Sequence, residues 1–397
     1  MAQSGHRSDE LDFLRALAII LVIVHHLGRV TLKGFVPDFL KQGWTGVDLF
    51  FVISGFLVTR SFASWLDHAG KDASLKVRLH LAFRYCQRRL VRILPPAWLW
   101  AFIPAIASLH FNRGGGFGSP SELLSEALAV VRFQYNYFAV STGFGNISHF
   151  WSLAVEEHYY LFLPLFLLII HGRISRIAGL LFIAALCFVN RAHAWKTGAG
   201  FGEISFLTHF RFDGLALGSI LGLMAAQIQL WSKTYLSAHG LWLSIRVLVI
   251  LAVAYLWISP SLFDRDQVVY FGYLSFAVTS ALLVALASAG MQVIPCPSYF
   301  RKGFAAIGRR SYTLYLIHVP IILAVREGRY RVLGMERTVA WETWFPAMTE
   351  LGIFLVALVV LTELNYRLLE SPLIELGKAR FGESRLSFDN SFQKLHV

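Results

Sequence analysis

The sequence predicts an all-α, polytopic transmembrane helical bundle with about ten spanning helices. Of its 397 residues, 56% are hydrophobic and only 15% are charged, whereas soluble domains carry about 25% charged residues. Apolar runs near the roughly 20 residues needed to cross a bilayer also recur along the whole chain. Aromatic residues make up 15% of the chain, which suits lipid-facing surfaces and interfacial belts.

Ten apolar segments meet this length requirement, although the fifth is short. They lie near 11–30, 46–64, 91–110, 149–171, 175–190, 205–228, 241–259, 267–289, 308–326 and 348–369. We therefore expect a transmembrane domain over 1–372 and a short, polar cytoplasmic tail over 373–397. The connection 111–148, rich in glycine near its start, is expected to be either a flexible loop or a lid over an acceptor groove.

The basic residues set the expected orientation. Lys and Arg gather in the connections 71–89 and 301–310, which lie inside if the N-terminus is inside, and ten crossings then return the C-terminus inside as well. The arginines between 326 and 337 would lie outside and count against this scheme. The net charge is +12, and we attribute it to Lys and Arg residues in cytoplasmic loops that orient the protein in the membrane. We therefore expect no nucleic-acid partner.

The first segment carries polar residues that a simple anchor does not need. Within Leu11–Leu27 it holds Asp12, Arg15, His25 and His26, and a charge deep in hydrocarbon costs at least about 2.5 kcal/mol, so such groups face protein or water. Residues eleven apart return to within about 20° of one helix face. Arg15 and His26 therefore share a stripe, while His25 points elsewhere. In the alternative interpretation, the Arg15 side chain extends to the membrane surface and His26 has only a structural role inside the protein.

The spacing of Arg15 and His26 resembles the signature of the integral-membrane acyltransferase family 3. The resemblance continues through GVDLFFVISGFLVT (46–59), RRLVRILPPAW (88–98), FWSLAVEEHYYLFLPL (150–165), RFDGLALG (211–218), SYTLYLIHVPI (311–321) and YRLLESP (366–372). It implies transfer of an acyl group, often acetyl, from a coenzyme A thioester to a hydroxyl of a sugar or related acceptor. Many relatives add a C-terminal domain of the serine-hydrolase type, which we do not expect here.

Basic residues near the cytoplasmic side form a candidate donor site. Guanidinium groups bind phosphate bidentately and stay charged, so Arg15, Arg89 and Arg92 are our candidates for binding acyl-CoA. Arg89 and Arg92 share a face if their helix extends that far, and the resemblance places an arginine pair of this spacing in the donor region. For Arg88, Arg310 and Arg367, orientation and lipid headgroup contacts are the better interpretation.

Polar residues nearer the outer side form a candidate catalytic site. A histidine suits removal of a hydroxyl proton at neutral pH, so we expect His26 to be the general base. A carboxylate would orient it, with Glu157 and Asp48 as candidates. Alternatives remain: Asp48 caps a helix, Asp213 pairs with Arg211, and Glu156 supports Arg92. His318 is expected to be structural or to face the acceptor.

Other chemistries lack support in the sequence. No Gly-x-Ser-x-Gly elbow is present, so direct transfer is preferred over an acyl-enzyme. No metal-ligand spacing appears, and the three cysteines are scattered.

We expect an O-acetyltransferase of the bacterial cytoplasmic membrane that uses acetyl-CoA and acts on lipopolysaccharide O-antigen or exopolysaccharide, free or lipid-linked. Alternatives are acylation of a macrolide or signalling oligosaccharide, a proton-coupled transporter that uses the same buried charges, and a structural membrane subunit. The transporter would need paired half-repeats, which the sequence does not show.

Overall fold

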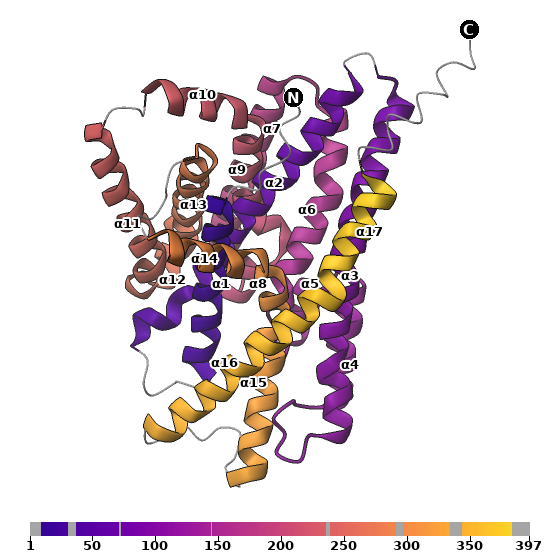
Figure 1. Cartoon of the computed structure of the whole chain (residues 1–397), viewed down its shortest axis with the longest axis vertical. Helices are drawn as coiled ribbons and strands as arrows, with labels where there is room; N and C mark the ends of the chain where they lie inside the picture. Colours follow the sequence, from indigo (N-terminus) through magenta and orange to yellow (C-terminus); the bar gives the residue numbers. More distant parts are fainter. Residues whose placement is uncertain are drawn as a thin grey trace.

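The computed structural model describes residues 9–30, 37–70, 73–143, 145–235, 239–290, 297–333 and 344–382, and over these residues it contains helices and no strand (Figure 1). The predicted all-α class is therefore confirmed. In chain order the elements are α1 (Asp9–Val30), η1 (Asp38–Thr45), α2 (Gly46–Ala69), α3 (Leu75–His110), α4 (Pro120–Val131), α5 (Tyr135–Thr142), α6 (Phe150–Ile169), α7 (Arg173–Lys196), α8 (Phe201–Phe206), α9 (Thr208–Leu223), α10 (Ala225–Tyr235), α11 (His239–Leu262), α12 (Arg265–Gln267), η2 (Val268–Gly272), α13 (Tyr273–Ser288), α14 (Ser298–Arg309), α15 (Ser311–Leu333), α16 (Trp344–Asn365), η3 (Tyr366–Glu370) and α17 (Ser371–Phe381).

Eight stretches of helix in the described part are long and apolar enough to cross a membrane. They are Asp9–Arg29, Lys41–Ala69, Leu75–His110, Phe150–Ile169, Arg173–Lys196, Ser244–Leu262, Arg265–Ser288 and Ala347–Phe381. A ninth is possible if Phe201–Leu223 and Ala225–Ser232, which meet at 64°, form one broken span. The chain is thus a multi-pass membrane protein. Over the described residues this count of eight or nine agrees with the prediction of about ten. The predicted segment 308–326 is not among them, because the last third of α15, from Arg326 onward, is rich in charged residues.

Three predicted segments differ from the helices observed. Helix α3 begins at Leu75, where Ser74 accepts a hydrogen bond from the Val77 N–H, so it runs through the basic stretch that hydropathy leaves out. Helix α7 is a full span of 24 residues rather than a short segment. The sixth segment, 205–228, is broken at Met224, between α9 and α10.

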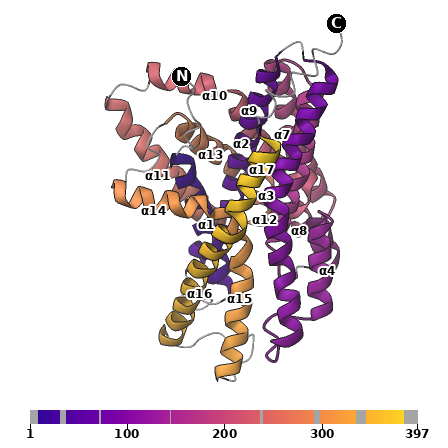
Figure 2. The same ribbon diagram turned by 45° about the vertical axis from the view of Figure 1, so that its right-hand side comes forward.

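The last helices form one long rod across the front of the molecule (Figures 1 and 2). Helix α16 continues through a π-helical turn, η3, into α17, and the rod passes the expected domain boundary at 372 to end at Phe381. The Arg84 side chain, on α3, donates to the backbone carbonyl of Arg380, so the start of the expected tail packs on α3. Residues 383–397 of that tail lie outside the described residues.

Close packing of α2 against α9 builds the centre of the bundle. A Cβ at Gly55 would lie 2.0 Å from the Leu215 carbonyl oxygen, and a Cβ at Gly218 would lie 2.0 Å from that of Val52. Only glycine permits this backbone approach, as in small-residue contacts between transmembrane helices. The contact fixes the rotation of α2, which carries both Asp48 and Ser54.

The connection 111–148 is structured by two buried carboxylates. Glu126, on α4, accepts hydrogen bonds from the Asn146 and Ile147 N–H groups and from the Tyr135 hydroxyl. Glu327, near the end of α15, accepts from the N–H groups of Gly114 and Gly116. The glycine-rich stretch is therefore held against α15 rather than left open.

Candidate active site

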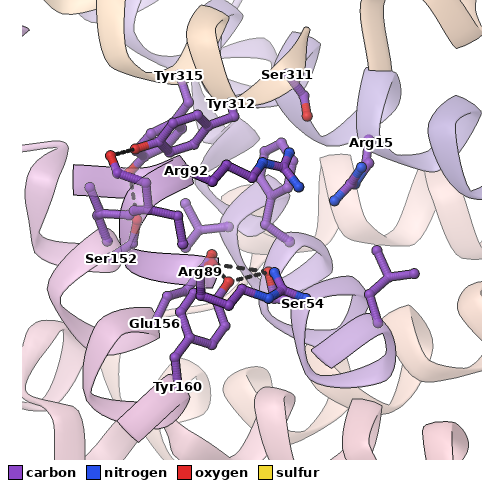
Figure 3. A pocket seen from close by; sticks show the side chains of 15 residues that line it. Arg15, Ser54, Arg89, Arg92, Ser152, Glu156, Tyr160, Ser311, Tyr312 and Tyr315 are labelled. Carbon is purple, nitrogen blue, oxygen red and sulfur yellow. Dashed lines mark hydrogen bonds between the residues drawn. The ribbon is translucent and has the colours of Figure 1, made fainter. Parts of the chain in front are cut away.

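A cavity lies among α1, α2, α3, α6 and α15, with about 780 Å³ of empty space that includes open solvent (Figure 3). One part of its wall is apolar: Val47, Phe50, Leu57, Ile93 and Leu153. The other part is polar: Arg15, Ser54, Arg89, Arg92, Ser152, Glu156, Tyr160, Ser311, Tyr312 and Tyr315. A cavity open to solvent with a mixed apolar and polar lining is typical of small-molecule and cofactor sites.

The three arginines predicted to bind the donor all line this cavity. Arg89 and Arg92 lie one turn apart on α3, so the condition that the helix extends to them is met. Arg15 comes from α1, and in Figure 3 its guanidinium group lies across the cavity from that of Arg92. The structure thus brings together three cationic groups from segments far apart in the sequence.

Neighbouring side chains hold two of these guanidinium groups in place. Arg89 donates to the Tyr85 hydroxyl at 3.3 Å and lies over the rings of Tyr85 and Tyr160. Arg92 donates to the Glu370 carboxylate at 3.4 Å. Arginine held in this way keeps its orientation without losing its charge.

Glu370 is a site residue that sequence reasoning missed. It is fully buried at the end of η3, and its second oxygen accepts a hydrogen bond from Thr313 at 2.7 Å. Thr313 in turn accepts from Asn365, whose oxygen accepts from Trp100. The motif YRLLESP contained the signal, because an acidic residue inside an apolar helix needs a partner.

Glu156, rather than its neighbour Glu157, faces the cavity. Its carboxylate accepts hydrogen bonds from Ser54, at 3.0 Å, and from Tyr160. Glu157 lies about 100° around the same helix and lines a smaller, mostly apolar cavity shared with Cys86 and Leu161. Among the described contacts none joins Glu157 to His26, so the structure does not place this carboxylate where it would orient the predicted base.

Asp48 is likewise directed away from His26. Its carboxylate forms a buried ion pair with Arg211 at 2.6 Å, and Arg211 also lies over the Tyr273 ring. Asp213 pairs with Arg191, again at 2.6 Å, rather than with Arg211 as the sequence suggested. These four charges tie α2, α7 and α9 together, and the alternative in which Asp213 pairs with Arg211 was wrong.

His26 lies one step beyond the cavity rather than on its wall. Its Nδ1 is 2.9 Å from the Val22 carbonyl oxygen and 3.3 Å from Nε2 of His318. His318 is on α15 one turn after Tyr315, which lines the cavity and donates to the His149 carbonyl. The ring centres of His318 and Tyr315 are 5.7 Å apart. His26 is thus connected to the cavity wall through His318 and Tyr315.

His25 points away from this group, as the helix geometry predicted. Its Nδ1 contacts the carbonyl oxygen of Lys41, in the middle of η1. The rings of His25 and His26 are almost perpendicular, at 88°. Within the described residues, no group of three or more His, Cys, Asp or Glu side chains has the arrangement of a metal site.

Fold and site together define an integral-membrane protein with a polar, arginine-lined cavity that adjoins a histidine cluster. Residues 8–364 match the family described as "Acyltransferase domain", and the chain belongs to this family. The resemblance stated from the motifs is therefore confirmed.

Curated relatives carry names that agree with this family. The chain is 26% identical over 392 residues to "Putative peptidoglycan O-acetyltransferase YrhL" of Bacillus subtilis (strain 168), covering 94% of the chain and 55% of the relative. It is 28% identical over 396 residues to O-acetyltransferase OatA of Staphylococcus aureus (strain NCTC 8325 / PS 47), covering 94% of the chain and 58% of the relative. The chain thus spans just over half the length of these relatives. No solved structure was found to match it.

Proposed function

We propose that this protein is an O-acetyltransferase that transfers the acetyl group of acetyl-CoA to a saccharide hydroxyl, with His26 as general base. One observation carries the proposal: Arg15, Arg89 and Arg92 converge in a single cavity whose wall adjoins His26 through Tyr315 and His318. Both relatives bear the name O-acetyltransferase, which supports the transfer of an acetyl group to a hydroxyl.

The donor's phosphates would bind the arginines. Guanidinium groups recognise phosphate through paired, charge-assisted hydrogen bonds, and Arg89 and Arg92 present two such groups from one helix face. Arg15 lies about 16 Å from His26 along α1, at about 1.5 Å per residue. The flexible arm of coenzyme A would span this distance, with its thioester end passing Tyr315 toward His26.

The chemistry would be a direct transfer. Nε2 of His26 takes the proton of the acceptor hydroxyl as the oxygen attacks the thioester carbonyl. The resulting tetrahedral intermediate expels the coenzyme A thiolate, which regains a proton from His26. The product is an acetyl ester together with free coenzyme A. Neither Glu157 nor Asp48 enters this scheme, because Glu157 lines the smaller cavity and Asp48 pairs with Arg211.

The acceptor would be a saccharide of the cell envelope, presented from the outer side or as a lipid-linked unit. The sequence favours O-antigen or exopolysaccharide, whereas the name of one relative specifies peptidoglycan. Peptidoglycan is therefore a second candidate acceptor. The protein would lie in the bacterial cytoplasmic membrane with both termini cytoplasmic, so that the arginines meet cytosolic donor.

The test uses purified protein in proteoliposomes with acetyl-labelled acetyl-CoA and, separately, O-antigen, exopolysaccharide and peptidoglycan fragments. We expect label on one saccharide class with the wild type and a loss of about 10²–10⁴-fold with His26→Ala. Equal transfer by both proteins would eliminate His26 as the base. Proton-driven uptake of a solute without transfer would replace the proposal with a transporter.

A further inference from the structure

The hydrogen bonds of the histidine cluster fix which nitrogen of each ring carries the proton. Nδ1 of His318 lies 2.8 Å from the Tyr315 carbonyl oxygen and 3.2 Å from that of Leu314. A carbonyl oxygen only accepts hydrogen bonds, so Nδ1 of His318 bears the hydrogen. Its Nε2 therefore carries a lone pair, and this lone pair faces Nδ1 of His26 at 3.3 Å.

The same reasoning applies to His26. Its Nδ1 lies 2.9 Å from the carbonyl oxygen of Val22, so this nitrogen also bears a hydrogen. That hydrogen is shared between the Val22 carbonyl and Nε2 of His318, and both partners are acceptors. The other nitrogen of His26, Nε2, is thus unprotonated, as a general base requires.

We infer that His318 is a positioning residue, which holds His26 in the tautomer with a free Nε2 and accepts a hydrogen bond from its ring when that ring becomes charged. The inference rests on the proposed function, in which His26 is the base. His318 is fully buried and anchored at Nδ1 by its own helix, so its Nε2 is held in a fixed direction. It occupies the place that a carboxylate holds in hydrolase triads, the place for which the sequence offered Glu157 and Asp48.

A neutral imidazole is a suitable orienting group in this setting. A carboxylate against His26 would be a buried charge that needs its own partners in the bundle. A second imidazole supplies the required acceptor without a permanent charge. His149 also packs against His318, with ring centres 5.1 Å apart, and donates through Nε2 to the Leu316 carbonyl. The orienting ring is therefore in contact with two other imidazoles.

The first test measures turnover by His318→Leu and His318→Gln, with His25→Leu as the matched control, because His25 is a neighbouring histidine on another helix face. Leucine has no acceptor, so kcat should fall about ten- to a hundredfold, the worth of one hydrogen bond to a charged group. The KM for acetyl-CoA should stay within about twofold. Glutamine presents an oxygen near the place of Nε2 and should restore most of kcat. A kcat unchanged in His318→Leu, or no recovery with glutamine, would overturn the inference.

The second test does not require turnover or a folded variant at position 318. The ¹⁵N chemical shifts of histidine-labelled wild type, assigned by comparison with His26→Ala, report which ring nitrogen carries hydrogen. We expect His26 and His318 to be protonated at Nδ1. A spectrum with His26 protonated at Nε2 would refute the inference. Wild type that shows the expected tautomers but transfers no acetyl group would refute the proposed function while leaving the tautomer assignment in place.

Discussion

Arg92 donates a hydrogen bond to Glu370 across 278 positions of sequence, and this contact joins α3 to the end of the final rod. Glu370 is fully buried, so its carboxylate needs hydrogen-bond donors: Arg92 donates to one oxygen and Thr313 to the other. We predict that Glu370→Ala lowers the free energy of unfolding by about 1–3 kcal/mol, because the buried Thr313 hydroxyl and the partly buried Arg92 guanidinium each lose an acceptor.

Loss of the Glu370 carboxylate should also weaken the binding of the donor, acetyl-CoA. Arg92 would no longer be held toward the cavity, so the KM for acetyl-CoA should rise in Glu370→Ala. Glu370→Gln keeps an oxygen for Thr313 and should recover part of the stability. Thermal unfolding and steady-state kinetics measure the two effects. A stable Glu370→Ala with an unchanged KM would contradict both.

The arginine pair gives a second prediction. Arg89→Ala and Arg92→Ala should each raise the KM for acetyl-CoA about tenfold or more, because each removes a charge-assisted contact to phosphate. The double variant should be worse than either single one, and kcat should change much less. Lysine substitutions should recover only part of the loss, since lysine lacks the paired geometry.

Arg367→Ala is the matched control for the arginine pair. Its side chain is 74% exposed, it pairs with Glu363, and it is not among the residues that line the cavity. The KM should remain that of the wild type. An equal rise in KM for all three single variants would indicate a general effect of positive charge rather than a binding site.

The two adjacent histidines give a third prediction. His25→Ala should reduce kcat less than about tenfold, whereas His26→Ala should reduce it by about 10²–10⁴-fold. The two side chains point in different directions: His25 contacts the Lys41 carbonyl, while His26 faces His318. Acetyl transfer measured at saturating donor compares the variants. Equal inactivation would mean that helix facing does not separate their roles.

Helical periodicity was sufficient to predict which residues lie on the same face of one helix. The eleven-residue spacing of Arg15 and His26 predicted a shared face of one helix. The spacing of Arg89 and Arg92 predicted the same for that pair, and both line the cavity. Hydropathy likewise located most of the spanning helices. It missed the start of α3 because the helical stretch from Leu75 to Arg89 contains several Lys and Arg residues among its apolar ones.

Long-range choices could not be made from the sequence. Which of Glu156 and Glu157 faces the cavity depends on the rotation of α6 about its axis. In the structure Glu156 faces it, where Ser54 and Tyr160 donate to its carboxylate. Asp48 takes its partner from α9, whose position depends on glycine packing rather than on any charge pattern. His318 reaches His26 across 292 positions, so no spacing rule connects them.

Glu327 gives a fourth prediction, which concerns pH. This residue lies beyond the apolar part of α15, where burial alone would raise its pKa, but hydrogen bonds from the Gly114 and Gly116 N–H groups and from Arg331 outweigh burial and lower the pKa. A carboxylate with a lowered folded pKa stabilises the protein above its unfolded pKa of about 4.3. This stabilisation is lost as the pH falls through the folded pKa.

Unfolding temperatures of wild type and Glu327→Gln between neutral and acidic pH test this. The wild type should be the more stable at neutral pH, and the difference should vanish in acid. Glu122→Gln is the control, since Glu122 is exposed on the same connection and should show little difference at any pH. A constant gap between wild type and Glu327→Gln across the range would refute the role of its charge.

The ion pair of Asp48 and Arg211 gives the last prediction, which distinguishes a structural role of Asp48 from a catalytic one. Both side chains are almost wholly buried, so Asp48→Ala should lower the free energy of unfolding by about 3–5 kcal/mol, because it leaves an unpaired buried guanidinium. Asp48→Ala combined with Arg211→Leu removes both charges and should recover much of that loss. If Asp48 only holds α2 to α9, the recovered double variant should also regain acetyl transfer. A double variant that is stable yet inactive would instead return Asp48 to the catalytic group.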